Sequence, residues 1–138
     1  MRGLTCFVLL LVAGCGVRAA EPPTVTVCQL YDQRQSPPAG EVRFQARALM
    51  GPRHGAIFMD PHCPPGTAIP FRFADHLPPD SQAVMFDHAL TGDVMDLSLR
   101  SFDAEVTGTY APATTINPRG LFTVDRVVWF RKSPPKAK

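Results

Sequence analysis

The chain has 138 residues, of which 45% are apolar and 19% are charged. This length fits one domain and excludes a large multidomain enzyme, and the composition excludes wholesale disorder. Residues 21–138 carry 12 Lys plus Arg (14 minus Arg2 and Arg18) and 12 Asp plus Glu, so the net charge of +2 belongs to the first residues. A neutral domain lacks the basic face of a nucleic-acid binder, and no nucleic-acid partner is expected.

Residues 1–20 are predicted to be a signal peptide. Arg2 gives the start a positive charge, and residues 4–14 form an apolar run that is too short to span a bilayer. No later stretch reaches the 18 apolar residues of a membrane span. We therefore expect an exported protein.

Two cleavage sites compete at the end of this signal. Val12-Ala13-Gly14-Cys15 resembles the bacterial lipobox, which implies acylation of Cys15 and a lipid anchor in the membrane. Gly16 in place of aspartate implies the periplasmic side of the outer membrane. The alternative is ordinary cleavage after Ala19 or Ala20, which would leave a periplasmic protein. We favour lipidation because Cys15 stands at the end of the apolar core.

The cysteines favour one disulfide. Cys6 and Cys15 belong to the signal, so Cys28 and Cys63 remain in the folded part, and two cysteines in an oxidising compartment pair. The alternative is a metal site or reactive thiol in Asp60-Pro61-His62-Cys63. That segment has no C-x-x-C and no second ligand pair at finger-like spacing, so no metal and no cofactor are expected.

The first predicted elements are a tether over residues 21–24 and a short helix that ends before Pro37. Thr26 and Gln29 form a T-x-x-Q capping box at the start of this helix. From residue 41 the apolar period is two, which predicts a strand over 41–49 that pairs with a second strand over 56–59. A third strand is predicted over 69–73.

The second half of the chain is predicted to begin with a helix capped by Asp80 and stopped by Gly92. Met95, Leu97 and Leu99 alternate with polar residues, and the phase of the alternation then slips, which predicts two strands or one bulged strand over 95–110. A last strand is expected over 121–130, and residues 132–138 form a flexible basic tail.

The period of two also predicts which side chains point inward. Three apolar side chains are expected inside the sheet and three polar ones in water. The inward set is Phe44, Val106 and Val124, and the outward set is Arg43, Glu105 and Thr107.

The order of elements resembles the OB-fold, a five-stranded partly open barrel with a helix between its third and fourth strands. The segments 26–30, 60–63 and 104–108 carry the resemblance. The chain looks like the small exported bacterial OB-like proteins that have no assigned activity. The resemblance implies a mainly β fold, with an OB-like β-barrel domain over 25–131 that includes a short N-terminal helix. No catalytic residue is carried over.

OB-folds bind ligands on strands two and three and on the adjoining loops. The residues at those places are Arg53, His54, Phe58, Phe71, Arg72 and Arg119. Aromatic rings beside arginines would suit a sugar chain or single-stranded nucleic acid. The alternative is that the phenylalanines fill the barrel.

The sequence has no G-x-S-x-G, P-loop, H-E-x-x-H or G-x-G-x-x-G motif, so we do not expect an enzyme. The first hypothesis is a non-enzymatic envelope lipoprotein that binds a partner protein or an envelope glycan. The alternatives are a small metal-dependent or hydrolytic enzyme that uses Asp60, His62 and Cys63, and a periplasmic binder of single-stranded nucleic acid.

Overall fold

The computed structural model describes residues 19–52, 55–93 and 95–134. Cys15, Arg53, His54 and the end of the expected basic tail lie outside the described residues. The described chain is mainly β, with five strands and two helices. In chain order they are α1 (Val27–Asp32), β1 (Glu41–Gly51), β2 (Gly55–Met59), β3 (Ala68–Phe73), α2 (Gln82–Thr91), β4 (Arg100–Ala111) and β5 (Leu121–Lys132).

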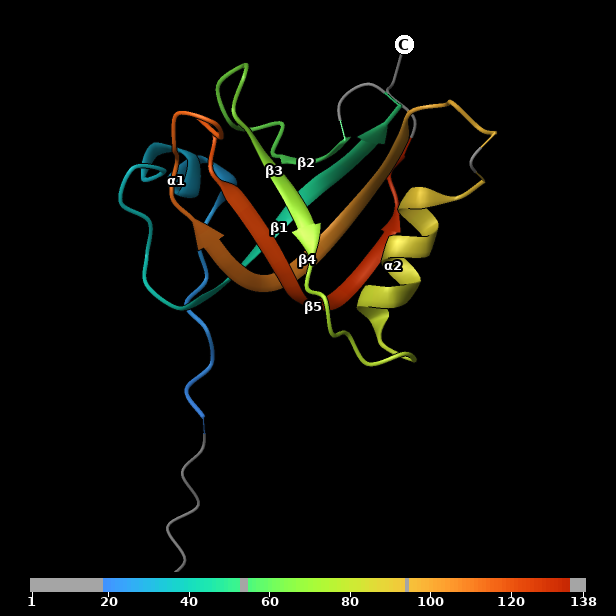
Figure 1. The fold of residues 1–138 in the computed structure, drawn as a ribbon, viewed down its shortest axis with the longest axis horizontal. Helices are drawn as coiled ribbons and strands as arrows, with labels where there is room; N and C mark the ends of the chain where they lie inside the picture. Colours follow the sequence, from blue (N-terminus) through green and yellow to red (C-terminus); the bar gives the residue numbers. More distant parts are fainter. Residues whose placement is uncertain (1–18, 53–54, 94, 135–138) are drawn as a thin grey trace, which may run out of the picture.

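The five strands form one sheet that closes in a ring, in the order β1-β2-β3-β5-β4 with β4 back against β1 (Figure 1). All neighbours are antiparallel except β3 and β5, which pair in parallel over only three residues, Phe71–Phe73 against Phe122–Val124. The rest of β5 is not paired with β3. Helix α2 packs against β5 there, and Figure 1 shows the helix alongside the end of that strand.

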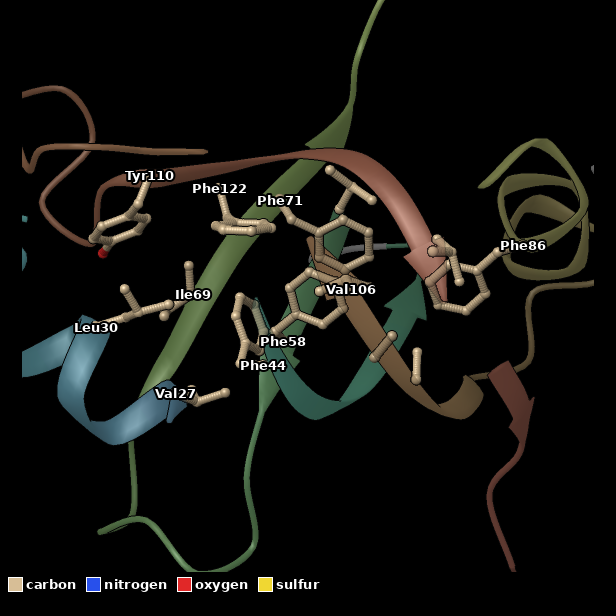
Figure 2. Packing of buried hydrophobic residues seen from close by; sticks show 14 of the residues in the cluster. Val27, Leu30, Phe44, Phe58, Ile69, Phe71, Phe86, Val106, Tyr110 and Phe122 are labelled. Carbon is tan, nitrogen blue, oxygen red and sulfur yellow. The ribbon is translucent and has the colours of Figure 1, made fainter. Parts of the chain in front are cut away.

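Phenylalanine rings fill the closed sheet (Figure 2). Phe44, Phe58 and Phe122 are fully buried, and the ring centroids of Phe44 and Phe122 are 4.8 Å apart in an edge-to-face arrangement. Leu30 of α1 and Phe86 of α2 lie at opposite ends of this cluster. Burying each such side chain contributes about 1.5 to 3 kcal/mol, so the core joins both helices to the sheet.

The helix starts follow local hydrogen bonding. The capping box of α1 is confirmed, because Gln29 N–H donates to Thr26 Oγ1 at 3.1 Å and Thr26 N–H donates to Gln29 Oε1 at 2.9 Å. The N-cap of α2 is Ser81 rather than Asp80, and Ser81 Oγ accepts from Val84 N–H at 3.3 Å. The reason is that Ser81 N–H donates to Pro78 O, which holds Asp80 inside a turn.

The strand predicted over 95–99 is wrong: β4 begins only at Arg100. Asp93 Oδ1 accepts from Met95 N–H at 2.9 Å, and Asp96 Oδ1 accepts from Ser98 N–H at 3.0 Å. Aspartate side chains that bond to the backbone two residues on form turns that compete with a strand ladder. The irregularities of β4 lie later, between Glu105 and Val106 and between Thr107 and Gly108.

The inward-facing residues are confirmed, since Phe44, Val106 and Val124 are all fully buried. The expectation that Glu105 and Thr107 face water is wrong, because they are 8% and 1% exposed. They are on the outer face of the sheet, and neighbouring side chains cover them.

The N-terminal segment lies along the edge of β1 and bonds to its backbone. Pro23 O accepts from Arg43 N–H and Val25 N–H donates to Arg43 O, both at 2.9 Å, so the end of the expected tether runs along β1. Glu21 Oε1 also accepts from the Arg43 guanidinium at 2.5 Å. The hydroxyl of Thr107, which pairs with Arg43 across the strands, is buried with no hydrogen-bond partner among the described groups.

The expected pairing of Cys28 and Cys63 is present, with the two sulfurs 2.04 Å apart. The bond joins α1 to the turn between β2 and β3, and Cys63 also packs against the core. Within the described residues, no helix is long and apolar enough to cross a membrane.

Candidate functional site

The two phenylalanines predicted to contact a ligand belong to the core. Phe58 is 0% exposed and Phe71 is 6% exposed, and their rings stack with centroids 3.9 Å apart. Alternate residues of β2 and β3 point into a closed sheet, where they meet each other rather than solvent. The structure therefore corrects this part of the predicted ligand site, and the alternative that these rings fill the interior is the one that holds.

The described arginines of that predicted site are exposed but lie in separate places. Arg72 is on β3, and its Nε is 3.4 Å from Thr123 Oγ1. Arg119 is in the loop before β5, where its carbonyl accepts from the Tyr110 hydroxyl at 2.5 Å. Burial, the largest effect, raises the pKa of Tyr110 to about 12, so the phenol stays protonated and serves as a donor.

The segment predicted as an alternative metal or nucleophile site forms a turn. Nδ1 of His62 and its backbone nitrogen are each 2.8 Å from Asp60 Oδ1. Cys63 is bonded to Cys28, so its sulfur is neither a thiolate nor a free metal ligand. In residues 19–52, 55–93 and 95–134, no three His, Cys, Asp or Glu side chains are grouped to hold a metal ion.

An apolar groove of about 710 Å³ lies beside the loop of residues 95–99. Its apolar lining comes from both helix and sheet, namely Leu49, Met59, Ala89, Leu99 and Phe102. Its charged lining consists of three cationic residues and one acidic residue, namely Arg47, Arg100, Lys132 and Asp96. We call this hollow the apolar groove.

The loop of residues 95–99 beside the apolar groove presents large apolar side chains to solvent. Met95 is 84% exposed, Leu97 70% and Leu99 64%. Leu97 lines a second, smaller hollow of about 240 Å³ between the loop and the end of β1. The loop is thus flanked by a hollow on each side.

Arg100 bonds this loop to the end of α2. Its guanidinium donates to the carbonyls of Leu90 and Thr91 at the end of α2, and to Asp96 Oδ2 at 2.9 Å. Hydrogen bonds from Ser98, the largest effect, and from Arg100 lower the pKa of Asp96 to about 2. This aspartate is therefore ionised throughout the neutral range, and the loop backbone is held by charge-assisted contacts.

Another hollow, of about 220 Å³, lies on the outer face of β1, β4 and β5, next to the Asp60 turn. We call it the Trp129 groove. The polar and aromatic residues of its lining are Gln45, Arg47, Asp60, His62, Asp103, Trp129 and Arg131. The sheet register places Gln45, Glu105 and Trp129 in one row, and Arg47, Asp103 and Arg131 in the next.

Glu105 organises the first of these rows. It accepts hydrogen bonds from the indole N–H of Trp129 at 2.7 Å, from Gln45 Nε2 at 3.0 Å and from the Arg43 guanidinium. Burial is the largest single effect and opposes ionisation. The donors Trp129, Arg43 and Gln45 together outweigh it and hold the pKa of Glu105 below its ordinary value.

Asp103 organises the second row. It accepts from Arg47 Nε and from the Ser133 hydroxyl, each at 2.9 Å. Burial again opposes ionisation most strongly, and the Arg47 and Ser133 hydrogen bonds bring the pKa below its ordinary value. Across the row, the Arg131 guanidinium carbon lies 5.5 Å from the centroid of the Trp129 ring.

Neither groove was predicted as a whole, although Asp60 and His62 of the Trp129 groove belong to the segment considered as an alternative metal or nucleophile site. The alternation of Met95, Leu97 and Leu99 marked an apolar segment, but a strand was the wrong interpretation of it. For the Trp129 groove, the signal was a polar outer face on the strands at 41–49 and 104–108, which the sequence assigned only to solvent. Pairing these outer faces requires the register between strands, which one sequence does not supply.

Comparisons of this chain with protein-family models, with curated proteins and with solved structures found no match.

Proposed function

We propose that this chain is a non-enzymatic protein of the bacterial cell envelope, with an OB-like domain that docks a partner protein at the apolar groove. The observation that carries this proposal is the exposure of Met95, Leu97 and Leu99 on a loop beside the apolar groove. Soluble domains rarely expose contiguous apolar side chains unless these meet another molecule.

The fixed backbone of the loop supports docking rather than a chance exposure. Arg100 ties the loop to the end of α2, and Asp93 and Asp96 hold its turns. A loop that is ordered before binding loses less conformational entropy when a partner seats on it. The apolar side chains therefore act as preformed anchors.

The occupant of the apolar groove is a partner segment with apolar side chains and a carboxylate. The apolar lining favours apolar side chains in the partner, and the excess of cationic lining residues favours a carboxylate. Lys132 and Arg47 both line this groove, and an acidic side chain of the partner can pair with Lys132, since Arg47 already pairs with Asp103. A partner of this kind would bury the apolar loop under a polar rim, as specific interfaces do.

The envelope location rests on the leader of residues 1–20, and the OB-like assignment on the order of the elements and on the closed five-stranded sheet, in which α2 follows β3. The lipid anchor at Cys15 is part of the same proposal. A Cys15→Ser variant is expected to leave the membrane fraction or to remain unprocessed. Unchanged fractionation of a fully processed Cys15→Ser protein would overturn the anchor and leave a periplasmic protein.

The docking proposal is tested with a photo-crosslinking residue at position 97 in intact cells, and with the same residue at position 116 as a control. Ile116 is 88% exposed, so it matches Leu97 in chemistry and exposure but lies in the loop between β4 and β5. We expect one partner to crosslink at 97 and not at 116. Mass spectrometry of the crosslinked peptide should find apolar residues beside Asp or Glu.

Two charge substitutions complete the test with purified components. Leu97→Asp is expected to weaken binding of that partner by about tenfold or more, because it places a charge in the apolar contact. Ile116→Asp should leave the affinity unchanged. Equal crosslinking at both positions, or equal binding by both variants, would overturn the docking site.

A further inference from the structure

We infer that the Trp129 groove is a binding site for an acidic saccharide, a sugar chain that carries both hydroxyl groups and a carboxylate. This site does not lie on the strands first expected to bind a ligand. It shares Arg47 and Pro61 with the apolar groove, so the variants that test it leave these two residues unchanged. The inference starts from a side chain that the fold holds unusually firmly. It then follows from the hydrogen-bonding groups that surround that side chain.

Trp129 is a fixed aromatic platform. Its indole N–H is bound at 2.7 Å by Glu105, which is itself 8% exposed and held by Gln45 and Arg43. The ring is half-buried and Arg131 lies over one of its faces, so the part left exposed is a fixed apolar surface that costs little side-chain entropy on binding. The C–H face of a pyranose ring packs on such a surface.

Arg131 and Arg47 supply the groups for a carboxylate. Arg131 lies over the Trp129 ring, a contact that orients the guanidinium but uses none of its N–H donors on an acceptor. The Nε–H of Arg47 donates to Asp103, and the terminal nitrogens of Arg47 have no hydrogen bond among the described groups. A guanidinium with free N–H groups is suited to bind a carboxylate in a bidentate fashion.

The acidic residues of the groove select a saccharide over other anions. Asp60 and Asp103 line the same hollow as the arginines, and both are oxygen acceptors. Hydroxyl groups can donate to them, whereas an acidic peptide or a nucleic acid carries many negative charges and few hydroxyl donors, so some of its charges would face Asp60 and Asp103. A ligand with hydroxyls and one carboxylate satisfies both kinds of side chain.

The site is long enough for more than one sugar unit. A neighbouring hollow of about 250 Å³ shares Gln45 and Asp60 with the Trp129 groove and continues along β1 to Arg43 and the Thr26 region. The two hollows run across the outer face beside the Asp60 turn, which the Cys28 to Cys63 bond holds. The inferred ligand is therefore an oligosaccharide.

The test uses the processed protein purified from cells, in detergent if it is lipidated. Trp129 is the only tryptophan in the chain, so its fluorescence reports on the groove directly. The acidic probes are a galactose oligomer that ends in one galacturonate and a muramic-acid disaccharide, the neutral probe is the galactose oligomer without the acid, and the peptide probe is oligoaspartate. We expect at least one acidic sugar to change the emission and to bind about tenfold or more tightly than the neutral oligomer.

Variants then locate the binding. Arg131→Gln is expected to weaken binding of the acidic sugar by about tenfold and to leave binding of the neutral sugar unchanged, since only the carboxylate contact is lost. Arg72→Gln is the matched control, because Arg72 is also an exposed strand arginine but on β3. Thermal unfolding of both variants checks that they are folded.

Three results would overturn the inference. The first is binding of oligoaspartate as tightly as the acidic sugars, which would make the groove a general anion or peptide site. The second is failure of both acidic sugars to bind the unmodified protein. The third is equal loss in Arg131→Gln and Arg72→Gln. Each result is independent of crosslinking at Leu97, so the docking proposal stands or falls separately.

Discussion

The indole N–H of Trp129 on β5 donates to Glu105 on β4 at 2.7 Å, across a pair of strands whose register shifts immediately after Glu105. This contact joins the only tryptophan of the chain to a carboxylate that is almost fully buried. The carboxylate is satisfied by Gln45 and Arg43 from β1 as well. The outer face of three strands is thus organised around one charged group.

The first prediction concerns acid. Since hydrogen bonds lower the pKa of Glu105 below 4.5 in the folded protein despite its burial, its contribution to stability is full above pH 4.5. That contribution is lost as the pH falls through the lowered folded-state pKa. We expect the midpoint temperature of thermal unfolding to decrease as the pH is lowered through this range, and the Trp129 emission to change with it.

Glu105→Gln is the control for this prediction. The variant cannot titrate at this position, so its unfolding midpoint should be lower at neutral pH and less sensitive to acid than that of the unmodified protein. Asp103 also has a lowered pKa, so some acid sensitivity remains in both proteins. Identical slopes of the midpoint against pH would show that Glu105 does not carry the acid response.

The second prediction concerns the core. Phe44 is fully buried between Phe58 and Phe122, so Phe44→Ala is expected to reduce the free energy of unfolding by about 3 to 5 kcal/mol. Thr109→Ala is the control, because Thr109 is exposed on β4, and it should cost within about 0.5 kcal/mol. Urea unfolding of both variants measures this. Equal losses would mean that the inward face of β1 is misassigned.

Local patterns in the sequence predicted the elements that local physics decides. The capping box of Thr26 and Gln29 needs only residues three apart, and the alternation over 41–49 needs only one buried face. The pairing of Cys28 with Cys63 followed because no other cysteine remains after the signal. The five-stranded sheet was implied by the resemblance of the element order to the OB-fold, and the structure has five strands that close in a ring.

Contacts between distant segments decided the rest. Alternation placed Glu105 outside the core correctly, but it equated the outside with water. Whether an outward side chain is covered depends on its cross-strand neighbours, here Trp129 24 residues later and Gln45 60 residues earlier. The strand predicted over residues 95–99 was wrong for a different reason. The side chains of Asp93 and Asp96 accept hydrogen bonds from the backbone two residues on, and these turns override an alternation that is typical of strands.

The third prediction concerns the Cys28 to Cys63 bond. The two residues are 35 positions apart, and in the chain-entropy model closing such a loop stabilises the fold by about 3 to 4 kcal/mol. A variant with serine at both positions should lose about that much free energy of unfolding. Two alkylatable thiols in the unmodified protein from the envelope would contradict the bond and would return Cys63 to the list of reactive residues.

The last prediction concerns Gly108, which lies just after a register shift of β4 against β5. A Cβ atom added there would be 1.9 Å from the carbonyl oxygen of Thr123, which is backbone and cannot rotate away. Gly108→Ala should therefore force the two strands apart, at a cost of about 2 to 3 kcal/mol.

Gly40→Ala separates this steric effect from the general cost of replacing a glycine. Gly40 has a φ of +82° but nothing within 4 Å of an added Cβ, so its replacement should cost only about 1 kcal/mol through backbone strain. Urea unfolding compares the two. A Gly108→Ala loss no larger than that of Gly40→Ala would show that β4 and β5 do not approach as closely as the structure has them, and the row that joins Glu105 to Trp129 would have to be reconsidered with it.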